Sequence, residues 1–198
     1  MITFNNLSED LPYKILKKYY DNALRSKQDQ IQAISISSYS DSRKEVDARM
    51  VNLKIINEKE MIFFSNYNSP KSLQFESNNK ILALIYWSSI DVQIRMRARI
   101  FKTSNKFSDE YFQNREIEKN ALAISSQQSQ EISSYNEVIQ NHKNVLKNND
   151  LTKRPNFWGG FSFIPHYFEF WEGHKSRLNK REIYELQNNI WSHAYLQP

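Results

Sequence analysis

The sequence predicts a mainly β fold with flanking helices, in which strands rich in aromatic residues could close a barrel. Residues 92–102 show the clearest alternation of apolar and polar side chains, which is typical of a strand with one buried face. Residues 49–56 and 61–64 are two β-rich runs separated by four polar residues, a pattern typical of a hairpin. Residues 156–173 hold the densest run of aromatic side chains, which indicates two further strands.

The composition indicates one domain with a sizeable core. We expect the 198 residues to form an N-terminal helix within 1–28 and a barrel with helical insertions over 29–198. The 12 Phe, 11 Tyr and 4 Trp must build much of the core or of a binding surface. The lack of cysteine excludes disulfides and thiolate metal sites, and we expect no metal. Because no signal peptide is evident and the longest apolar run, Ile81–Trp87, is too short to span a bilayer, we expect a soluble cytoplasmic protein.

Charge and glycine content together narrow the ways in which this chain could bind an anion. A formal net charge of +5 suggests an anionic partner. The three glycines, Gly159, Gly160 and Gly173, all lie near the C-terminus, which excludes a Walker loop and a G-x-G-x-x-G turn. Any bound phosphate must therefore be held mostly by Lys, Arg, Ser and Gln side chains.

Helical spacing and capping residues predict four helices. They are a first helix beginning near Asp10 that covers the core, a short helix over 68–76, a third from Ser108, and a fourth of about 17 residues with its apolar stripe from Ile132 to Leu146. We expect His142, on that last stripe, to be a histidine at the edge of the core.

Four further strands complete the expected sheet. Residues 33–37 alternate cleanly, and residues 80–87 form a continuous apolar run that we expect to be buried on both faces. Residues 183–186 and 190–195, joined by a turn at Asn188-Asn189, are expected to form a closing hairpin.

Three local patterns place cations where a phosphate could bind, and each has a plainer alternative. Arg49 and Lys54 stand at the ends of a short apolar run, where they could also simply face water. Lys71 lies at a helix N-terminus, which is a plausible anion seat or an ordinary capped connector. Tyr111 and Arg115, four residues apart, share a helix face and could grip a phosphate or serve packing alone.

The basic stripe of residues 92–102 also has two interpretations. Arg95, Arg97 and Arg99 could bind a polyanion, or they could pair with carboxylates on a solvated face. We favour the second interpretation, because charge stripes usually face water and no recognised nucleic-acid motif accompanies this one. We therefore expect neither nucleic acid nor membrane among the partners.

Six motifs occur in the order and spacing of one protein family: R-M-V-N-L-K, S-P-K, Q-Q-S, F-W-G-G-F, E-F-W-E-G and R-L-N-K-R. From Ala33 to Pro198 the chain resembles pyridoxine (pyridoxamine) 5′-phosphate oxidase, the FMN enzyme that makes pyridoxal 5′-phosphate. The resemblance implies an FMN-binding split β-barrel. It also implies a homodimer with two FMN molecules bound across the subunit interface.

The resemblance assigns flavin-binding positions along most of the chain. They are Arg49, Met50, Val51, Lys54, Phe64, Ser65, Lys71, Gln93, Gln128, Ser129, Trp171 and Arg181. Arg49, Lys71 and Ser65 offer charge-assisted donors for a phosphate without a glycine loop. Gln93 and Gln128 can bind polar atoms of the flavin, and Trp171 supplies an apolar wall.

The resemblance also assigns substrate-binding positions. They are Lys54, Tyr111, Arg115, Lys119, Arg177 and Asn179. The first three would hold the substrate phosphate, and Arg177 would be the catalytic residue over the pyridine ring. The implied reaction is hydride transfer from the C4′ carbon of the substrate to N5 of the flavin. O2 then reoxidises the flavin and yields H2O2.

Three positions depart from the family pattern. Pro70 stands where the family usually has a second phosphate-binding arginine, Lys119 where it has a substrate-phosphate serine, and Asn179 where it has the histidine of R-x-H. We also expect this chain to lack the basic segment that in the family precedes the barrel and can fold over the active site. These departures leave the flavin positions mostly intact and bear chiefly on the substrate.

Two alternative functions therefore stand beside the oxidase. The first is a related split-barrel FMN oxidase that acts on another ring, such as a phenazine precursor, and it predicts flavin binding without turnover of pyridoxine 5′-phosphate. The second is a non-catalytic module that holds flavin or uses the basic stripe to bind nucleic acid, with an affinity that falls steeply with salt.

Overall fold

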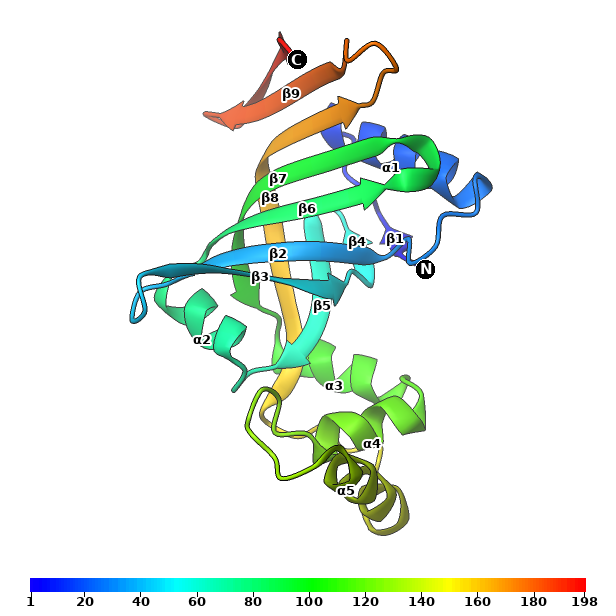
Figure 1. Ribbon diagram of the computed structural model, residues 1–198, viewed down its shortest axis with the longest axis vertical. Helices are drawn as coiled ribbons and strands as arrows, with labels where there is room; N and C mark the ends of the chain where they lie inside the picture. The colour runs from blue at the N-terminus through cyan, green and yellow to red at the C-terminus, as the bar shows by residue number, and fades with distance from the viewer.

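A computed structural model describes residues 1–198, and one ten-stranded sheet dominates it (Figure 1). The strands are β1 Thr3–Asn5, β2 Ala33–Ser40, β3 Glu45–Asn52, β4 Ile55–Asn57, β5 Glu60–Asn66, β6 Lys80–Trp87, β7 Val92–Lys102, β8 Trp158–Glu172, β9 Lys180–Gln187 and β10 Ile190–Leu196. The helices are α1 Leu11–Arg25, α2 Pro70–Ser77, α3 Asn105–Gln113, α4 Ile117–Ser125 and α5 Tyr135–Asn148, with a 3₁₀ turn at Ser88–Ile90. The mainly β fold with flanking helices is confirmed.

The sheet is antiparallel except for the parallel pair β1–β4. Its main path runs β1-β4-β5-β8-β7-β6-β2-β3, and β9 and β10 continue from the C-terminal half of β8. β8 is the strand on which the whole sheet depends. Its first half pairs with β5, its second half with β9, and nearly its full length with β7.

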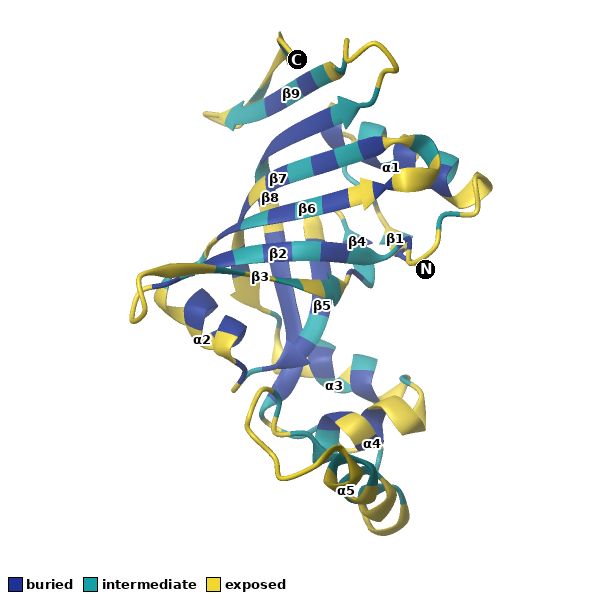
Figure 2. Cartoon of the chain, viewed as in Figure 1, coloured by how far each residue is buried: buried dark blue, intermediate teal, exposed yellow.

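Aromatic and β-branched side chains from α1 and the strands form one core. The alternation of β7 is confirmed, because Ile94, Met96 and Ile100 are buried while Arg97 and Arg99 are exposed (Figure 2). On α1, the buried side chains are those that face the sheet. The ring of Tyr13 contacts that of Phe168 edge to face at 5.1 Å. The first helix therefore covers the core, as expected.

Residues 49–64 do not form the single hairpin that the sequence predicted. β3 ends at Asn52 and pairs with β2, whereas β4 pairs with β5. Between β3 and β4, the amide of Leu53 donates to the carbonyl of Gln32, and the amide of Lys54 donates to the carbonyl of Ile62. The chain therefore crosses at this point from one part of the sheet to another. The tight turn lies at Glu58-Lys59, where Glu58 adopts φ 52°.

The aromatic block near the C-terminus is one strand of 15 residues rather than two. None of its glycines has a positive φ, so none makes a turn. Instead, a Cβ on Gly159 would lie 2.1 Å from the hydroxyl oxygen of Tyr67, and one on Gly160 would lie 2.5 Å from that of Thr103. The two glycines are therefore places of close approach, which is the second role that glycine plays in strands.

Several smaller expectations were wrong. β6 is not buried on both faces, because Tyr86 is exposed on a face that no helix covers. α3 begins at Asn105, where the hydroxyl of the N-cap residue Ser104 accepts the amide of Phe107. Neither α4 nor β1 was expected. α5 is shorter than expected and has no buried residue, and His142 on it bonds the carbonyl of Glu118.

The closing hairpin is confirmed, with β9 and β10 paired around Asn188-Asn189. No helix of the structure is long and apolar enough to cross a membrane.

Replacing Phe168 by alanine should lower the free energy of unfolding by about 3–5 kcal/mol. The reason is that this ring, on β8, is fully buried and contacts Tyr13 of α1 and Trp191 of β10. Phe101→Ala is the matched control, because its ring is 52% exposed, and it should cost about 1 kcal/mol or less. Urea unfolding at one protein concentration measures both, and equal losses would contradict the assigned core.

Candidate active site

The largest group of predicted site residues lines one cavity of about 470 Å³. It lies between β3, the end of β5, the start of α2 and the segments that carry α3 and α4. Its lining is Arg49, Met50, Val51, Asn52, Lys54, Phe64, Ser65, Pro70, Lys71, Tyr111, Arg115, Gln128, Ser129 and Trp158. The cavity thus unites nine of the twelve predicted flavin positions with the three positions predicted to hold the substrate phosphate.

One end of the cavity carries two cations, the buried Lys71 and the partly buried Arg49. The Nζ of Lys71 donates to the hydroxyl of Ser69 at 3.1 Å. The one carboxylate paired at this end is that of Asp47, whose Oδ2 lies 3.7 Å from NH2 of Arg49. Burial, and then the charge of Arg49, lowers the pKa of Lys71 to about 8. This end therefore holds positive charge that an anionic ligand would stabilise.

Neighbouring strands and α2 fix the guanidinium of Arg49. Its NH1 donates to the carbonyl of Ile36 at 3.2 Å and to the hydroxyl of Ser38 at 2.6 Å. Its NH2 donates to Oε1 of Gln74 at 3.1 Å. Because these bonds hold the fork in one orientation, Arg49 is pre-organised as an anion ligand.

The segment between α4 and α5 brings polar groups to the same end. Oε1 of Gln128 accepts from the hydroxyl of Ser65 at 3.3 Å and from the amide of Asn66 at 3.4 Å. These bonds leave the amide nitrogen of Gln128 as a donor toward a ligand. Ser129 adopts the left-handed backbone conformation, with φ 70°.

Stacked aromatic rings form a wall of the cavity. The rings of Phe64 and Tyr111 lie nearly parallel with their centroids 3.5 Å apart, and Phe64 also stacks on Trp158 at 5.4 Å. The guanidinium of Arg115 lies over Trp158, 4.9 Å from the ring centroid. This wall fixes the positions of Tyr111 and Arg115.

A second cationic group lies beside this wall. Lys54 and Arg115 line the cavity, whereas Lys119 lies outside the lining and pairs through Nζ with Glu116. Burial is the main cause of the lowered pKa of Lys54, and the charges of Lys119 and Arg115 lower it further. NH1 of Arg115 donates to the carbonyl of Lys119 at 2.7 Å and to Oδ1 of Asn120 at 3.3 Å. We call these three cations and the hydroxyl of Tyr111 the second anion seat. Like charges this close indicate a site that an anion would stabilise.

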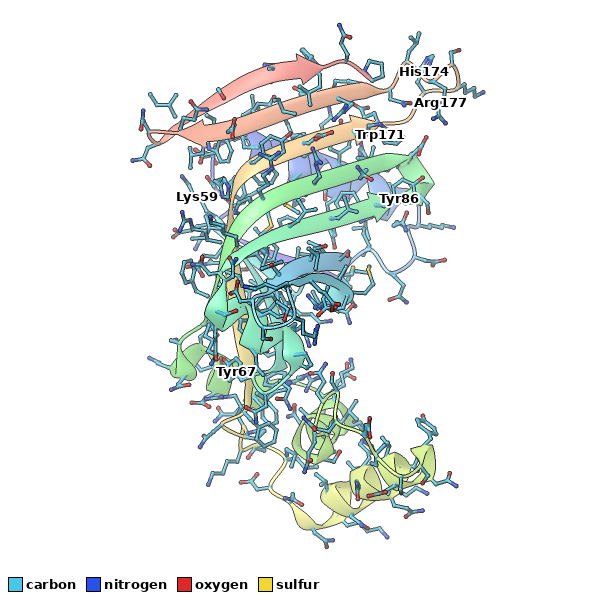
Figure 3. All side chains as sticks on the ribbon, turned by 60° about the vertical axis from the view of Figure 1, so that its left-hand side comes forward. Lys59, Tyr67, Tyr86, Trp171, His174 and Arg177 are labelled. Carbon is cyan, nitrogen blue, oxygen red and sulfur yellow. The ribbon has the colours of Figure 1, made fainter.

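The remaining predicted residues lie elsewhere in the chain. Gln93, Trp171 and Arg181 form one row across β7, β8 and β9, because Trp171 pairs with both of the others. Arg177 and Asn179 lie on the loop between β8 and β9. Figure 3 shows Trp171 and Arg177 at the end of the sheet remote from Tyr67, which directly follows the cavity strand β5. One copy of the chain does not bring these five residues to the cavity.

Arginines in this row and beside it on β7 have partners within the protein. Arg181 donates to Glu169 from Nε and NH2, both at 2.9 Å, and Arg95 pairs with the same buried carboxylate. The guanidinium of Arg97 lies 4.4 Å from the ring centroid of Tyr167. Two members of the basic stripe are thus engaged within the protein, which weakens the case for a polyanion surface.

Sequence reasoning missed two lining residues, Asn52 and Trp158. Both lie inside quoted motifs, R-M-V-N-L-K and F-W-G-G-F, so the motifs themselves were the available signal. The supports of Arg49 are different. Ser38 and Gln74 lie far from it in sequence, and no local pattern points to them. No group of three or more His, Cys, Asp or Glu in the structure could hold a metal ion.

Comparison with known proteins gives the family. Curated pyridoxine/pyridoxamine 5′-phosphate oxidases from Mannheimia succiniciproducens and Legionella pneumophila (strain Lens) are 32% and 33% identical to this chain. Each match covers 96% of this chain, and 90% and 89% of the respective relative. The chain belongs to the pyridoxine/pyridoxamine 5′-phosphate oxidase family. The predicted resemblance is confirmed.

Two further comparisons concern the C-terminal region and the fold. Residues 158–198 match the family model described as the pyridoxine 5′-phosphate oxidase C-terminal dimerisation region. Among solved structures, PhzG from Burkholderia lata 383, in complex with tetrahydrophenazine-1-carboxylic acid, superposes with a TM-score of 0.89 at 22% identity, covering 94% of this chain and 92% of the other. A pyridoxamine 5′-phosphate oxidase-related, FMN-binding protein from Nostoc punctiforme superposes with a TM-score of 0.76 at 11% identity. The match covers 96% of this chain and 99% of the other. These likenesses show the fold and confirm the split β-barrel.

The lowered pKa of Lys71 predicts that phosphate binding weakens at alkaline pH. Below pH 8 its ammonium is charged, whereas above pH 8 the ligand-free protein holds it neutral, so that binding then requires proton uptake. We expect the dissociation constant for FMN, measured by quenching of flavin fluorescence, to rise about tenfold between about pH 7.5 and 9.5.

Riboflavin, which lacks the phosphate, is the ligand control and should show a much smaller change. Lys71→Met should bind FMN weakly at both pH values, without the step above pH 8. A tenfold step that persists in this variant would assign the titration to another group.

Proposed function

We propose that this protein is an FMN-dependent oxidase that converts pyridoxine 5′-phosphate or pyridoxamine 5′-phosphate to pyridoxal 5′-phosphate, with O2 as acceptor and H2O2 as product. The observation that carries the proposal is the single cavity with two separate cationic ends. Two phosphate-bearing ligands, a flavin and a substrate, require two such ends. The names of the curated relatives support the same activity.

FMN fits the end formed by Arg49, Lys71 and Ser65. A nearly buried ammonium with a lowered pKa and a guanidinium held by Ser38 form a donor set suited to a phosphate, and no glycine loop is needed. Gln128 would bind polar atoms of the ring system. When bound, FMN supplies the hydride acceptor and the reaction with O2. The residues of the chain bind it and exclude water from one side.

The substrate phosphate fits the second anion seat, where Lys54 and Arg115 contribute charge and Tyr111 a hydroxyl. Holding the phosphate fixes the pyridine ring beside the flavin end of the same cavity. That orientation is what the protein contributes to the reaction, since the redox chemistry belongs to the cofactor. Lys119 adds a third cation where the family usually has a serine, and an added cation favours a phosphate over a less charged ligand.

We further propose that a second copy of the chain completes the site. Gln93, Trp171 and Arg181 share one row at the far end of β8, and Arg177 and Asn179 follow it. All but Gln93 lie within residues 158–198, the region that matches the family's dimerisation region. A homodimer that brings this row to the partner's cavity would unite all the predicted flavin and substrate residues.

A second candidate function is a split-barrel oxidase that acts on another ring. It is favoured by the structural likeness to PhzG and by the departures at Pro70 and Asn179. The three cations beside Tyr111 favour the phosphorylated substrate, because a tetrahydrophenazine carboxylate carries one negative charge and a phosphate ester about two at neutral pH.

Anaerobic addition of pyridoxine 5′-phosphate to the FMN-loaded protein tests the function directly. We expect the visible flavin band to bleach and to recover in air, with the aldehyde product appearing in stoichiometric amount. Pyridoxamine 5′-phosphate should act in the same way, and unphosphorylated pyridoxine should act poorly. A band that stays unbleached with both phosphorylated substrates would reject the proposal and favour the second candidate.

Arg177→Ala should lower kcat/KM by about 100-fold, because loss of an orienting contact at the substrate ring costs about this factor. FMN affinity should not change, since Arg177 is assigned to the substrate. Lys175→Ala, in the same loop, is the matched control and should retain activity. Turnover of Arg177→Ala at the level of this control would remove Arg177 from the reaction.

A further inference from the structure

The second anion seat contains a carboxylate that its assignment to substrate does not explain. Glu116 directly follows Arg115 and is the N-cap residue of α4, but its side chain caps no amide of the helix. Instead, its Oε1 pairs with Nζ of Lys119 at 2.8 Å. The peptide of Lys119 is itself tied to the seat, since its carbonyl accepts from Arg115. The carboxylate therefore lies at the edge of the second anion seat. It pairs with Lys119, the one cation of the seat that stands where the family usually has a serine.

Glu116 also interacts with the other two cations of the seat. Its pKa is lowered chiefly by the hydrogen bond from Lys119 and by the charge of Lys119, with further contributions from Arg115 and Lys54. Conversely, the charge of Glu116 offsets part of the lowering of the pKa of Lys54, which burial chiefly causes. The second anion seat and Glu116 together form a cluster of three cations and one carboxylate. Its formal charge is +2, from +3 for Lys54, Arg115 and Lys119 and −1 for Glu116.

A bound phosphate and the carboxylate of Glu116 compete for the same positive charge. In the proposed reaction the phosphate is unchanged, so substrate and product carry it equally. Affinity for the phosphate beyond what is needed to orient the ring therefore does not speed the chemical step and only retains the product. A carboxylate within the second anion seat would weaken the binding of both the substrate and the product.

We propose that Glu116 is a built-in counter-ion that competes with the ligand phosphate for Lys119 and thereby speeds the departure of the phosphorylated product. The inference rests on the proposed function for the identity of the product. It assigns Glu116 as a positioning residue that acts through Lys119 and makes no contact with the reacting ring. The repulsion between Glu116 and a ligand grows in proportion to the ligand's negative charge.

The test compares Glu116→Gln with Glu118→Gln in the FMN-loaded protein, so that the flavin-phosphate end is occupied. Both side chains are exposed and both lie at the start of α4, but only Glu116 pairs with Lys119. Three ligands share one ring and differ in charge: 4-deoxypyridoxine 5′-phosphate, its 5′-sulfate analogue and 4-deoxypyridoxine itself. At about pH 8 the ester groups carry charges of about −2 and −1, and the last ligand has none.

Glu116→Gln should tighten binding of the phosphate about tenfold and of the sulfate about threefold, and should leave the unesterified ring unchanged. The tenfold factor is about the square of the threefold factor, because the interaction energy doubles with the charge. Calorimetry at low ionic strength measures the three dissociation constants. Both gains should shrink in strong salt, because the pair is exposed. Stopped-flow displacement should show slower release of pyridoxal 5′-phosphate, and Glu118→Gln should match the wild type in every measurement.

Two other results would overturn the inference and leave the proposed function intact. In the first, Glu116→Gln binds the phosphate ligand no more tightly than the wild type does. In the second, Glu116→Gln binds all three ligands more tightly by the same factor, which would indicate a change in the shape of the site rather than in its charge. Failure of the proposed function looks different, since the wild type would not turn over pyridoxine 5′-phosphate. Inorganic phosphate then serves as the probe: tighter binding by Glu116→Gln supports the counter-ion, and unchanged binding rejects it.

Discussion

The continuous pairing of β8 is the constraint on which both the fold and the proposed site depend. Trp158 begins this strand at the cavity, and Trp171 lies next to its other end. The 13 steps between them, at about 3.3 Å each, correspond to about 43 Å of strand. Because β5, β7 and β9 hold the strand in register along this length, it cannot fold back on itself. A single chain therefore keeps its two aromatic ends apart, and a shared site requires two chains.

The second constraint is the scarcity of glycine. A glycine-rich loop binds phosphate through backbone amides, which carry no net charge to desolvate. This chain must use Lys71 and Arg49, whose partial burial is unfavourable until an anion arrives, as the lowered pKa of Lys71 shows. Ser38 and Gln74 offset part of that cost by holding the guanidinium. Ligand binding and local stability are for this reason linked at the flavin-phosphate end of the cavity.

Much of the fold and of the cavity could be predicted from the sequence, because short-range patterns encode them. The strict alternation of β7 predicted its buried face, and the R-M-V-N-L-K motif pointed to residues that line the cavity. The predictions that failed concern features set by contacts between distant parts of the chain. Nothing in residues 49–56 shows that Leu53 and Lys54 cross between strands, since their backbone partners, Gln32 and Ile62, come from elsewhere.

The separation of Trp171 from the cavity was equally hidden from local patterns, because a motif gives a residue's role and not the copy of the chain in which it acts. The supports of Arg49 were missed for a related reason. They are set by the packing of α2 against β2 and β3, which no spacing within a single segment can reveal.

α5 has no buried residue, although the segment that precedes it carries Gln128 and Ser129 to the cavity. A helix held by so little apolar contact opens at a small fraction of the free energy needed to unfold the barrel. The two walls of the cavity therefore differ in rigidity: the strand side is fixed by the sheet, and the side next to α5 is held loosely. Amide hydrogens of α5 would exchange early, long before those of β8, and the segment with Gln128 and Ser129 would be the first part of the cavity wall to loosen.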